Sequence, residues 1–244
     1  MKKLVKILMV FALGSLICIP GMAMALTFSD SFEGTALNPF WTVEYQDSGT
    51  IGLSSAQSHS GTQSLQLSST SGGQRNLWLT HDFGEKMVGS VSVWFYDSAP
   101  GQQTLYSHLM MYDMSVSPTT LGFETFIGIM DYDASYYYAM TASSVIPPVP
   151  SVIARSVGWH KYEAVFGDAE TKLYIDGTEV YSALGEYGLT RLSLQLSGPS
   201  WRPDATSYFD DFSANVRPVP LPPTALLLGT GLLGLAGWRR FRKS

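Results

Sequence analysis

The carboxylates are the first residues to consider, because two carboxyl groups that flank a glycosidic bond can cleave it, one as acid and one as nucleophile or base. The acids nearest to such an arrangement are Glu124 and the pair Asp131 and Asp133. Seven residues separate Glu124 from Asp131. On one extended strand these two side chains point to opposite faces and lie more than ~20 Å apart. This spacing does not make a catalytic pair.

Other catalytic patterns are also missing from the sequence. No serine lies in the G-x-S-x-G turn that exposes a hydrolase nucleophile. The four histidines, His59, His81, His108 and His160, do not have the spacing of metal ligands. We therefore expect a protein that is not an enzyme, with a glycoside hydrolase or polysaccharide lyase as the alternative.

The aromatic residues are the second set of candidates, because exposed rings can stack on the apolar faces of sugars. Trp41, Trp94 and Trp159 are expected in the core, where most rings of a sandwich lie. The remaining aromatics, including Tyr112, are candidates for stacking on sugar rings. Among them we assign carbohydrate binding to Trp78, Tyr106, Tyr136, Tyr138 and Trp201. For Trp201, in a loop rich in Gly and Pro, a lid over the sandwich edge is the alternative.

A β-hairpin is predicted around Asp176-Gly177. These two residues suit a two-residue type I′ turn, since both central positions need positive φ. With this loop Ile175 pairs with Thr178, and Leu173 pairs with Val180. The pairing leaves one apolar and one polar face, as in an antiparallel sheet over a core.

The rest of the chain repeats this pattern. About twelve short segments alternate between apolar and polar residues, with Leu65 and Leu67 facing inward, and none shows a helical period. Strands at this spacing are typical of an all-β sandwich or jelly roll. The sequence therefore predicts one all-β domain over residues 26–216.

Charge and cysteine content exclude other classes. Residues 26–224 carry 20 acidic and eight basic side chains, a net charge of −12. A surface this acidic repels phosphate, so nucleic-acid binding is excluded. The only cysteine is Cys18, so no disulfide can form within the domain.

Several short motifs occur along residues 26–216. They are Gly158-Trp-His, Tyr162-Glu-Ala-Val-Phe166, Leu173-Tyr-Ile-Asp-Gly177, Phe32-Glu-Gly34, His59-Ser-Gly61 and Phe209-Asp-Asp-Phe212. Together they resemble the concanavalin A-like and laminin-G-like jelly rolls, and the resemblance implies a sandwich of two antiparallel sheets.

Carbohydrate-binding members of this fold often hold one structural calcium where the opening and closing strands meet. The resemblance therefore implies a calcium site made by Glu33 with Asp210 or Asp211, completed by carbonyls of the His59–Gln63 turn. Carboxylate and carbonyl oxygens are the ligands that calcium prefers. The alternative is that these acids are solvated or hydrogen-bonded at strand ends.

Both ends of the chain carry sorting signals. Residues 1–25 predict a signal peptide, with Lys2, Lys3 and Lys6 before an apolar run and cleavage after Ala25. The alternative is a lipoprotein signal that uses Cys18.

Residues 217–244 combine a proline motif, an apolar run of 14–18 residues and a basic end. The apolar run is shorter than the ~20 residues that a membrane-spanning helix needs. This tail resembles the PEP-CTERM signal, which implies an exosortase-type membrane protease as partner. A simple membrane anchor is the alternative. The motif residues are Val219, Pro220, Leu221, Pro222, Arg239 and Arg240, with Leu221 where the usual motif has glutamate.

The expectations combine into a non-catalytic jelly-roll protein at the surface or in the matrix of a Gram-negative bacterium, held transiently at the inner membrane. Its expected task is to bind glycan or organise exopolysaccharide. The alternatives are a structural surface protein without a small ligand, or a polysaccharide-degrading enzyme on the same fold.

Overall fold

The computed structural model describes residues 24–70, 75–115, 123–142, 149–185 and 188–219, which are all β-strands and loops. The segment Ala25–Val219 forms one compact unit. The all-β prediction is therefore confirmed. The strands are β1 (Leu26–Asp30), β2 (Thr42–Gln46), β3 (Gly49–Ser54), β4 (Ser64–Ser69), β5 (Arg75–Asp97), β6 (Tyr106–Asp113), β7 (Phe123–Ile129), β8 (Tyr136–Ala142), β9 (Val149–Ala154), β10 (Gly158–Phe166), β11 (Glu170–Ile175), β12 (Thr178–Leu184), β13 (Leu189–Gly198) and β14 (Ala205–Pro218).

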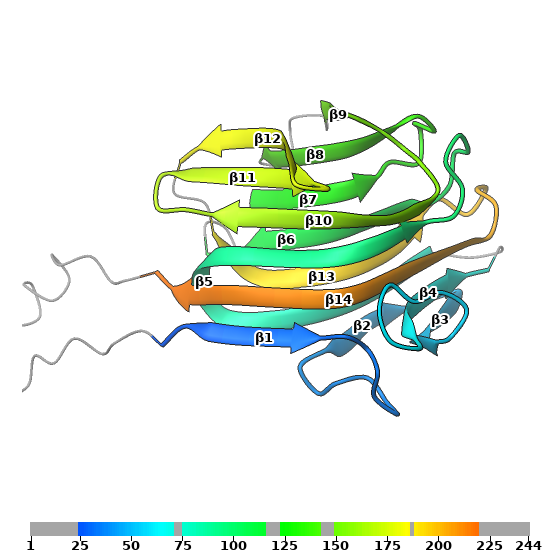
Figure 1. Cartoon of the computed structure of the whole chain (residues 1–244), viewed down its shortest axis with the longest axis horizontal. Helices are drawn as coiled ribbons and strands as arrows, with labels where there is room; N and C mark the ends of the chain where they lie inside the picture. Colours follow the sequence, from blue (N-terminus) through cyan, green and yellow to red (C-terminus); the bar gives the residue numbers. More distant parts are fainter. Residues whose placement is uncertain (1–23, 71–74, 116–122, 143–148, 186–187, 220–244) are drawn as a thin grey trace, which may run out of the picture. The chain divides into compact units, whose positions relative to one another are not determined.

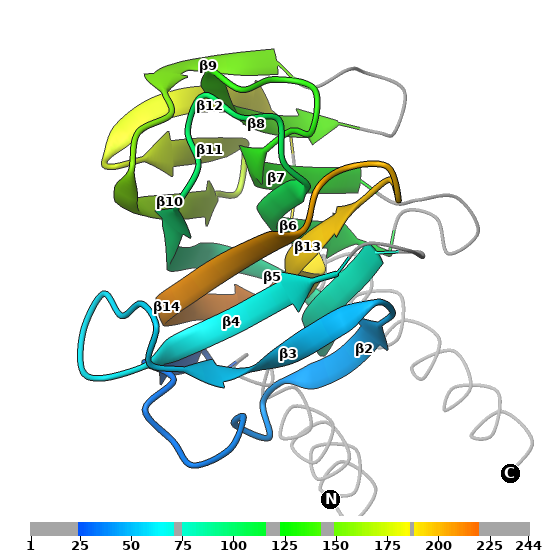
Figure 2. The ribbon, with the colours of Figure 1, turned by 90° about the vertical axis from the view of Figure 1, so that its right-hand side faces the viewer.

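The strands form two layers that share β5 (Figure 1). The front layer, which faces the viewer in Figure 1, runs β12–β11–β10–β5–β14, and both β1 and β4 pair with β14. Figure 2 shows β4 beside β14, with β3 next to β4. The back layer runs β2–β5–β13–β6–β7–β8–β9. Neighbouring strands are antiparallel throughout, as expected for a sandwich.

Strand β5 is 23 residues long and belongs to both layers. Residues 75–87 pair with β13 in the back layer, and residues 89–97 pair with β10 and β14 in the front layer. The strand changes layer at Gly89, where φ is +132° and a Cβ would lie 2.2 Å from the carbonyl oxygen of Asn215. Only glycine tolerates both constraints. The sequence predicts two short strands here; the structure has one continuous strand.

The core lies between the two layers and is built by the alternating side chains of each strand. Leu65 and Leu67 are fully buried, as predicted. Their partners from the front layer include Val91, Val93, Phe95, Tyr162, Phe166, Leu173 and Phe209, and those from the back layer include Leu77, Leu79, Leu109, Ile127, Leu192 and Leu194. Burial of this area supplies the main driving force for folding.

The hairpin between β11 and β12 has the predicted turn. Asp176 and Gly177 have φ angles of 51° and 76°, so both central residues have positive φ. Ile175 pairs with Thr178, which is the register that the two-residue loop requires.

The predicted pairing of Leu173 with Val180 is wrong. The register shifts between residues 173 and 174, and Leu173 pairs with Tyr181. A β-bulge inserts one extra residue and changes which side chains face the core. Tyr181 therefore packs against the core, and its hydroxyl donates to the carbonyl of Thr141 at 3.2 Å.

The predicted sorting segments lie almost entirely outside the described residues. Strand β14 includes Arg217 and Pro218, the first two residues of the predicted tail, and Val219 N–H donates to the carbonyl of Lys86 at 3.0 Å. Within the part of the chain that the structure describes, no helix is long and apolar enough to cross a membrane.

Candidate functional site

The outer face of the back layer, opposite the core, carries an unusual set of polar side chains. In β13, Leu192 and Leu194 enter the core, so Arg191, Ser193 and Gln195 point to this outer face. The sequence pattern predicts that such a face is wet. Ser193 and Gln195 are instead almost completely buried, at 0% and 2% exposed. Buried polar groups need partners, so their surroundings define a candidate site.

Gln195 connects two side chains of the neighbouring strand β6. Gln195 pairs in register with His108, and its amide group touches both His108 and Tyr112. Its Nε2 atom donates to the Tyr112 hydroxyl at 2.9 Å, and its Oε1 atom lies 2.9 Å from His108 Nε2. One amide of β13 therefore holds an imidazole and a phenol of β6 at fixed positions.

This orientation of Gln195 determines the state of His108. Because the amide N–H goes to Tyr112, the carbonyl oxygen accepts the Nε2–H of His108, and Nδ1 carries the lone pair. Burial lowers the pKa of His108 to about 4, against which the hydrogen bond with Gln195 acts weakly. His108 is therefore a neutral imidazole at pH 7 with an available basic nitrogen.

Gly128 makes room for this imidazole on the next strand, β7. It pairs with His108, and a Cβ at this position would lie 2.3 Å from the His108 Cβ atom and 2.3 Å from the carbonyl oxygen of Ser107. No larger residue fits without moving the main chain.

A second row crosses the same face four residues along β6. Arg191, Tyr112 and Glu124 are paired in register across β13, β6 and β7. Burial raises the pKa of both Tyr112 and Glu124. Arg191 donates to Glu44 at 2.8 Å and lies 3.5 Å from Asp82. The row places a phenol between a guanidinium and a carboxyl group.

Several buried polar atoms of this face have no hydrogen-bond partner among the described residues. They are Trp78 Nε1, His108 Nδ1, Ser193 Oγ and Glu44 Oε2. Trp78 and His108 flank Gln195 from either side in the register, and Ser193 is two residues away on β13. A buried donor or acceptor without a partner costs about 1–3 kcal/mol. A bound ligand rich in hydroxyl or carboxyl oxygens would supply these partners.

One edge of the face is closed by a second group of polar residues. Tyr106 shares the face with His108, and burial together with a hydrogen bond to Asp131 raises the pKa of Tyr106 to about 12. Arg202 lies 3.5 Å from Asp131 and donates to Gln103 at 2.7 Å. This edge links the β6 strand to the loop before β14.

Of the five predicted sugar-binding aromatics, Trp78, Tyr106 and Tyr138 lie on this face, and Tyr136 shares it with Tyr138 by alternation along β8. Tyr138 pairs with Gly128, is only 6% exposed and donates to Asp133 at 2.8 Å. Tyr136 and Trp201 are exposed, Trp201 at 79%, and Trp201 lies in the loop after β13. The prediction that these rings bind sugar stays a prediction.

His108 and Gln195 were not predicted from the sequence as site residues. A signal was present: polar residues alternate with leucines at 191, 193 and 195, and His108 and Tyr112 share one face of β6. What the pattern could not show is that these two strands are neighbours.

Two tryptophans lie elsewhere than predicted. Trp41 is in the core, but Trp94 and Trp159 are half-buried on the outer face of the front layer, so the prediction for them is wrong. The physical reason is alternation: Val93 and Phe95 of β5 and His160 and Tyr162 of β10 take the inward positions.

The acids predicted to bind calcium hold the His59–Gln63 turn by hydrogen bonds. Glu33 accepts from Thr62 N–H at 2.8 Å and Gln63 N–H at 2.9 Å, and these bonds lower its pKa, that from Gln63 most. Asp210 accepts from His59 N–H at 2.8 Å. The turn thus presents N–H donors to these acids, where a cation needs carbonyl oxygens. The donor set does not fit a shared ion, and the described residues contain no group of three His, Cys, Asp or Glu that could hold one.

Asp211 also holds this turn, and we call the His59–Gln63 turn with Glu33, Asp210 and Asp211 the latch. The Asp211 Oδ2 atom lies 2.6 Å from His59 Nδ1, and its Oδ1 atom accepts from the Ser60 hydroxyl at 2.8 Å.

Ser156 contacts His160 and His160 contacts Asp176, as in the serine–histidine–aspartate triad of a hydrolase. The histidine here is not placed to act as the base. His160 Nδ1 lies 2.7 Å from Asp176 Oδ2, and Nε2 lies 3.1 Å from the Ser156 hydroxyl. However, Nε2 also lies 2.9 Å from the carbonyl oxygen of Ser156, which can only accept. An Nε2–H directed at this carbonyl leaves no lone pair on Nε2 to activate the serine. The contact fastens the β11–β12 hairpin to the start of β10.

Comparison with known proteins gives the fold. No protein-family model matches this chain, and no curated protein matches it in sequence. Solved structures do match. An endo-β-1,4-glucuronan lyase from the fungus Trichoderma reesei has a TM-score of 0.57 at 15% identity over 79% of this chain and 95% of that one. A β-glucanase of Bacillus licheniformis has a TM-score of 0.54 at 14% identity over 77% and 96%.

A third similar structure is a GlcNAc-α1-4-Gal-releasing endo-β-galactosidase from Clostridium perfringens, with a TM-score of 0.60 at 12% identity over 79% of this chain and 62% of that one. Since these neighbours are polysaccharide-degrading enzymes, they overturn the expectation that the protein is not an enzyme. That expectation relied on carboxylates paired along one strand, whereas polar side chains from several strands share the outer face of the back layer. The chain has the concanavalin A-like jelly-roll fold, shared with glycoside hydrolases and lyases.

Proposed function

We propose that the protein is a polysaccharide-cleaving enzyme whose active site is the cluster of His108, Gln195 and Tyr112 on the outer face of the back layer. The observation that carries the proposal is the set of buried, unpaired polar atoms around a neutral imidazole. Evolution tolerates such a cost chiefly where a ligand relieves it. The similar lyase and glucanase structures support a glycan as that ligand.

The residues favour β-elimination over hydrolysis. A hydrolase needs two carboxyl groups about 5–9.5 Å apart. The carboxyl groups that Arg191 and Tyr112 bring to this face are Glu44 on β2 and Glu124 on β7. Their strands are separated by β5, β13 and β6, so their main chains lie roughly 19 Å apart across the sheet. A pair of this separation does not reach both sides of one bond.

Elimination needs a base and an acid instead. In a uronic-acid chain, a base removes the proton from the carbon next to the carboxylate, a carbon–carbon double bond forms, and the bond to the leaving glycosidic oxygen breaks. His108 Nδ1 has the free lone pair of a base. Tyr112 keeps its proton because burial raises its pKa, and it accepts from Gln195, so its O–H is available to protonate the leaving oxygen.

The unpaired donors suit the substrate of this reaction. Trp78 pairs with Gln195 on the neighbouring strand β5, and Ser193 lies two residues before Gln195 on β13. The Trp78 Nε1–H and the Ser193 hydroxyl have no partner among the described residues. Both can donate to carboxylate or hydroxyl oxygens of a uronic-acid residue. Gln195 acts as a positioning residue, since it fixes the tautomer of His108 and the direction of the Tyr112 hydroxyl.

The test is cleavage of polyuronic acids and of neutral β-glucans by the purified protein. With polyuronic acid as substrate, we expect ultraviolet absorbance to rise, because elimination forms an unsaturated sugar at the cleaved end. Tyr112→Phe removes one hydroxyl and should lower kcat by about 10²–10⁴-fold. Tyr174→Phe, on the front layer, is the matched control and should leave the rate unchanged. Reducing ends without the unsaturated product would refute elimination, and full activity of Tyr112→Phe would refute the site.

We further propose that this activity is exported. The signal peptide over residues 1–25 and the PEP-CTERM-like tail support a cell-surface location, with an exosortase-type protease as processing partner.

A further inference from the structure

The outer face of the front layer carries a row of three aromatic rings. Tyr208 of β14, Tyr96 of β5 and Trp159 of β10 are paired in register across adjacent strands. The Tyr96 ring centre lies 5.3 Å from that of Trp159 and 6.2 Å from that of Tyr208. All three rings are half-buried, so each keeps an exposed part. Adjacent strands are about 4.8 Å apart, so the row is roughly 10 Å long.

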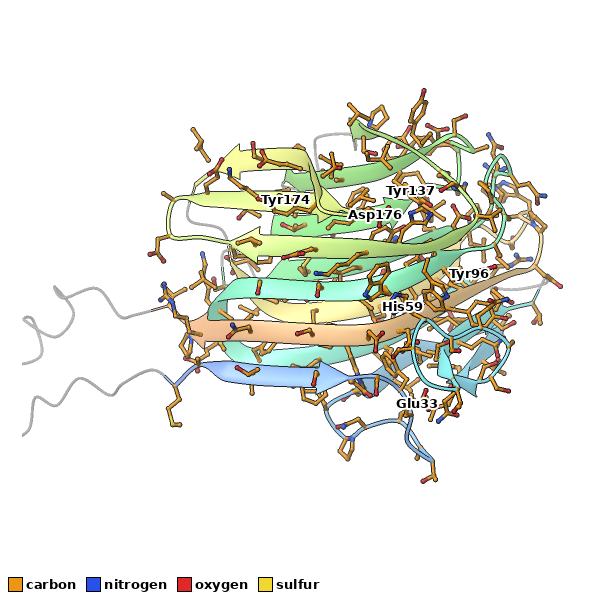
Figure 3. The ribbon with its side chains drawn as sticks, in the orientation of Figure 1. Glu33, His59, Tyr96, Tyr137, Tyr174 and Asp176 are labelled. Atoms are coloured by element: carbon orange, nitrogen blue, oxygen red, sulfur yellow. The ribbon has the colours of Figure 1, made fainter. Side chains whose placement is uncertain are left out.

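A second pair of rings extends this surface and is held rigidly. His59 stacks on Trp94 at 3.8 Å with 16° between the planes, and its ring lies 5.7 Å from that of Trp159. The latch described above fixes His59, through its ring contact with Asp211 and its main-chain bond to Asp210. Figure 3 shows His59 and Tyr96 close together on this face. The platform therefore loses little entropy when a ligand binds.

Neutral amide and hydroxyl groups edge the Tyr208 end of the row. Gln66 donates to the Tyr208 hydroxyl at 3.1 Å, and the hydroxyls of Ser68 and Thr206 lie 3.0 Å apart beside it. The charged side chains of the same face are engaged in ion pairs: Lys161, two residues after Trp159 on β10, binds Glu163 at 3.0 Å, and Lys172 of β11 binds Glu170 and Glu179. Flat rings edged by neutral amide and hydroxyl groups complement a chain of sugar rings, which has apolar faces and hydroxyl edges.

We propose that this aromatic row, Tyr208, Tyr96 and Trp159, is a second, non-catalytic binding surface for the polysaccharide that the enzyme cleaves. The choice of a glycan as occupant rests on the proposed function. The row lies on the front layer and the catalytic cluster on the back layer, with the core between them. The surface therefore holds polymer without blocking the active site, and its effect is on retention on insoluble polymer.

The experiment measures two quantities on the full protein: retention on insoluble polysaccharide of the cleaved class, and kcat/KM on short soluble fragments. Trp159→Ala should weaken retention by several-fold, because one stacked ring contributes on the order of 1 kcal/mol. The rate on soluble fragments should stay unchanged. Tyr174→Ala is the matched control, because Tyr174 is a half-buried ring on the same face outside the row (Figure 3).

Each outcome decides the proposal separately from the proposed function. Equal retention of Trp159→Ala and wild type overturns the binding surface, as does a wild type that cleaves soluble chains without binding insoluble ones. Retention without cleavage supports the surface and refutes the enzyme. A dimer that Trp159→Ala dissociates in sedimentation would show that a second copy of the chain covers the row. Tyr208→Ala, at the end of the row, repeats the test if Trp159→Ala does not fold.

Discussion

Protonation of His108 should make the stability of this protein unusually sensitive to mild acid. Burial lowers the pKa of His108 to about 4, whereas an unfolded chain has the ordinary value near 6.5. The unfolded state therefore binds the proton first as the pH falls. The folded state has its full stability with respect to His108 above pH 6.5, and it loses stability progressively as the pH falls from 6.5 toward 4. At pH 4.5 the linkage relation gives a loss of about 2.5 kcal/mol from this one residue.

The assay is urea unfolding of wild type and His108→Asn at pH 7 and pH 4.5. Other titrating groups contribute equally to both proteins, so the difference between the two pH-dependent losses isolates His108. We expect wild type to lose about 2–3 kcal/mol more than the variant. If both proteins lose the same free energy of unfolding, His108 is not held neutral by burial, and its assignment as the base in the active site fails with it.

Further measurements test other parts of the structure. Asp97→Asn should lower the free energy of unfolding by about 3–5 kcal/mol, because the buried Arg155, which it contacts at 2.9 Å, loses its counter-charge; a change below 1 kcal/mol would contradict this. Calcium and a chelator should give identical melting curves, since N–H groups already occupy Glu33 and Asp210; a higher Tm in calcium would restore the predicted ion. Salt should raise kcat/KM on polyuronic acid, because screening weakens repulsion by the net charge of −12; a fall would show a locally cationic site. The mass of the native protein should lack the signal peptide and the segment beyond about Pro222, and a mass that includes both would refute processing.

The local features of the fold could be predicted from the sequence. Asp176-Gly177 determines its own turn, because positive φ at two successive residues is a property of these residue types. Leu65 and Leu67 are buried because alternation along a strand needs no knowledge of the partner strand. The all-β class follows from many such segments together.

The site could not be predicted in the same way, because it depends on which strands are neighbours. Gln195 meets His108 and Tyr112 only because β13 pairs with β6, and these residues are more than 80 positions apart in the chain. Alternation shows that a strand has two faces, but it does not show what covers the second one. His108 and Gln195 look in sequence like solvent-exposed polar residues, but both are buried on this face. Burial keeps His108 neutral, and Gln195 bridges it to Tyr112.

The layer change of β5 and the bulge in the β11–β12 hairpin depend on contacts that the local sequence pattern does not specify. Strand β5 changes layer at Gly89, where only glycine fits against the carbonyl oxygen of Asn215 in β14, and the register of β11 with β12 shifts between Leu173 and Tyr174. A shift of one residue reverses the faces of a strand, and its cost is decided by packing across the sandwich. Most strands, the Asp176-Gly177 turn and core positions such as Leu65 and Leu67 follow from residues that are close in the chain. Which polar residues share a face follows only from the fold, because contacts between strands far apart in the chain make that choice.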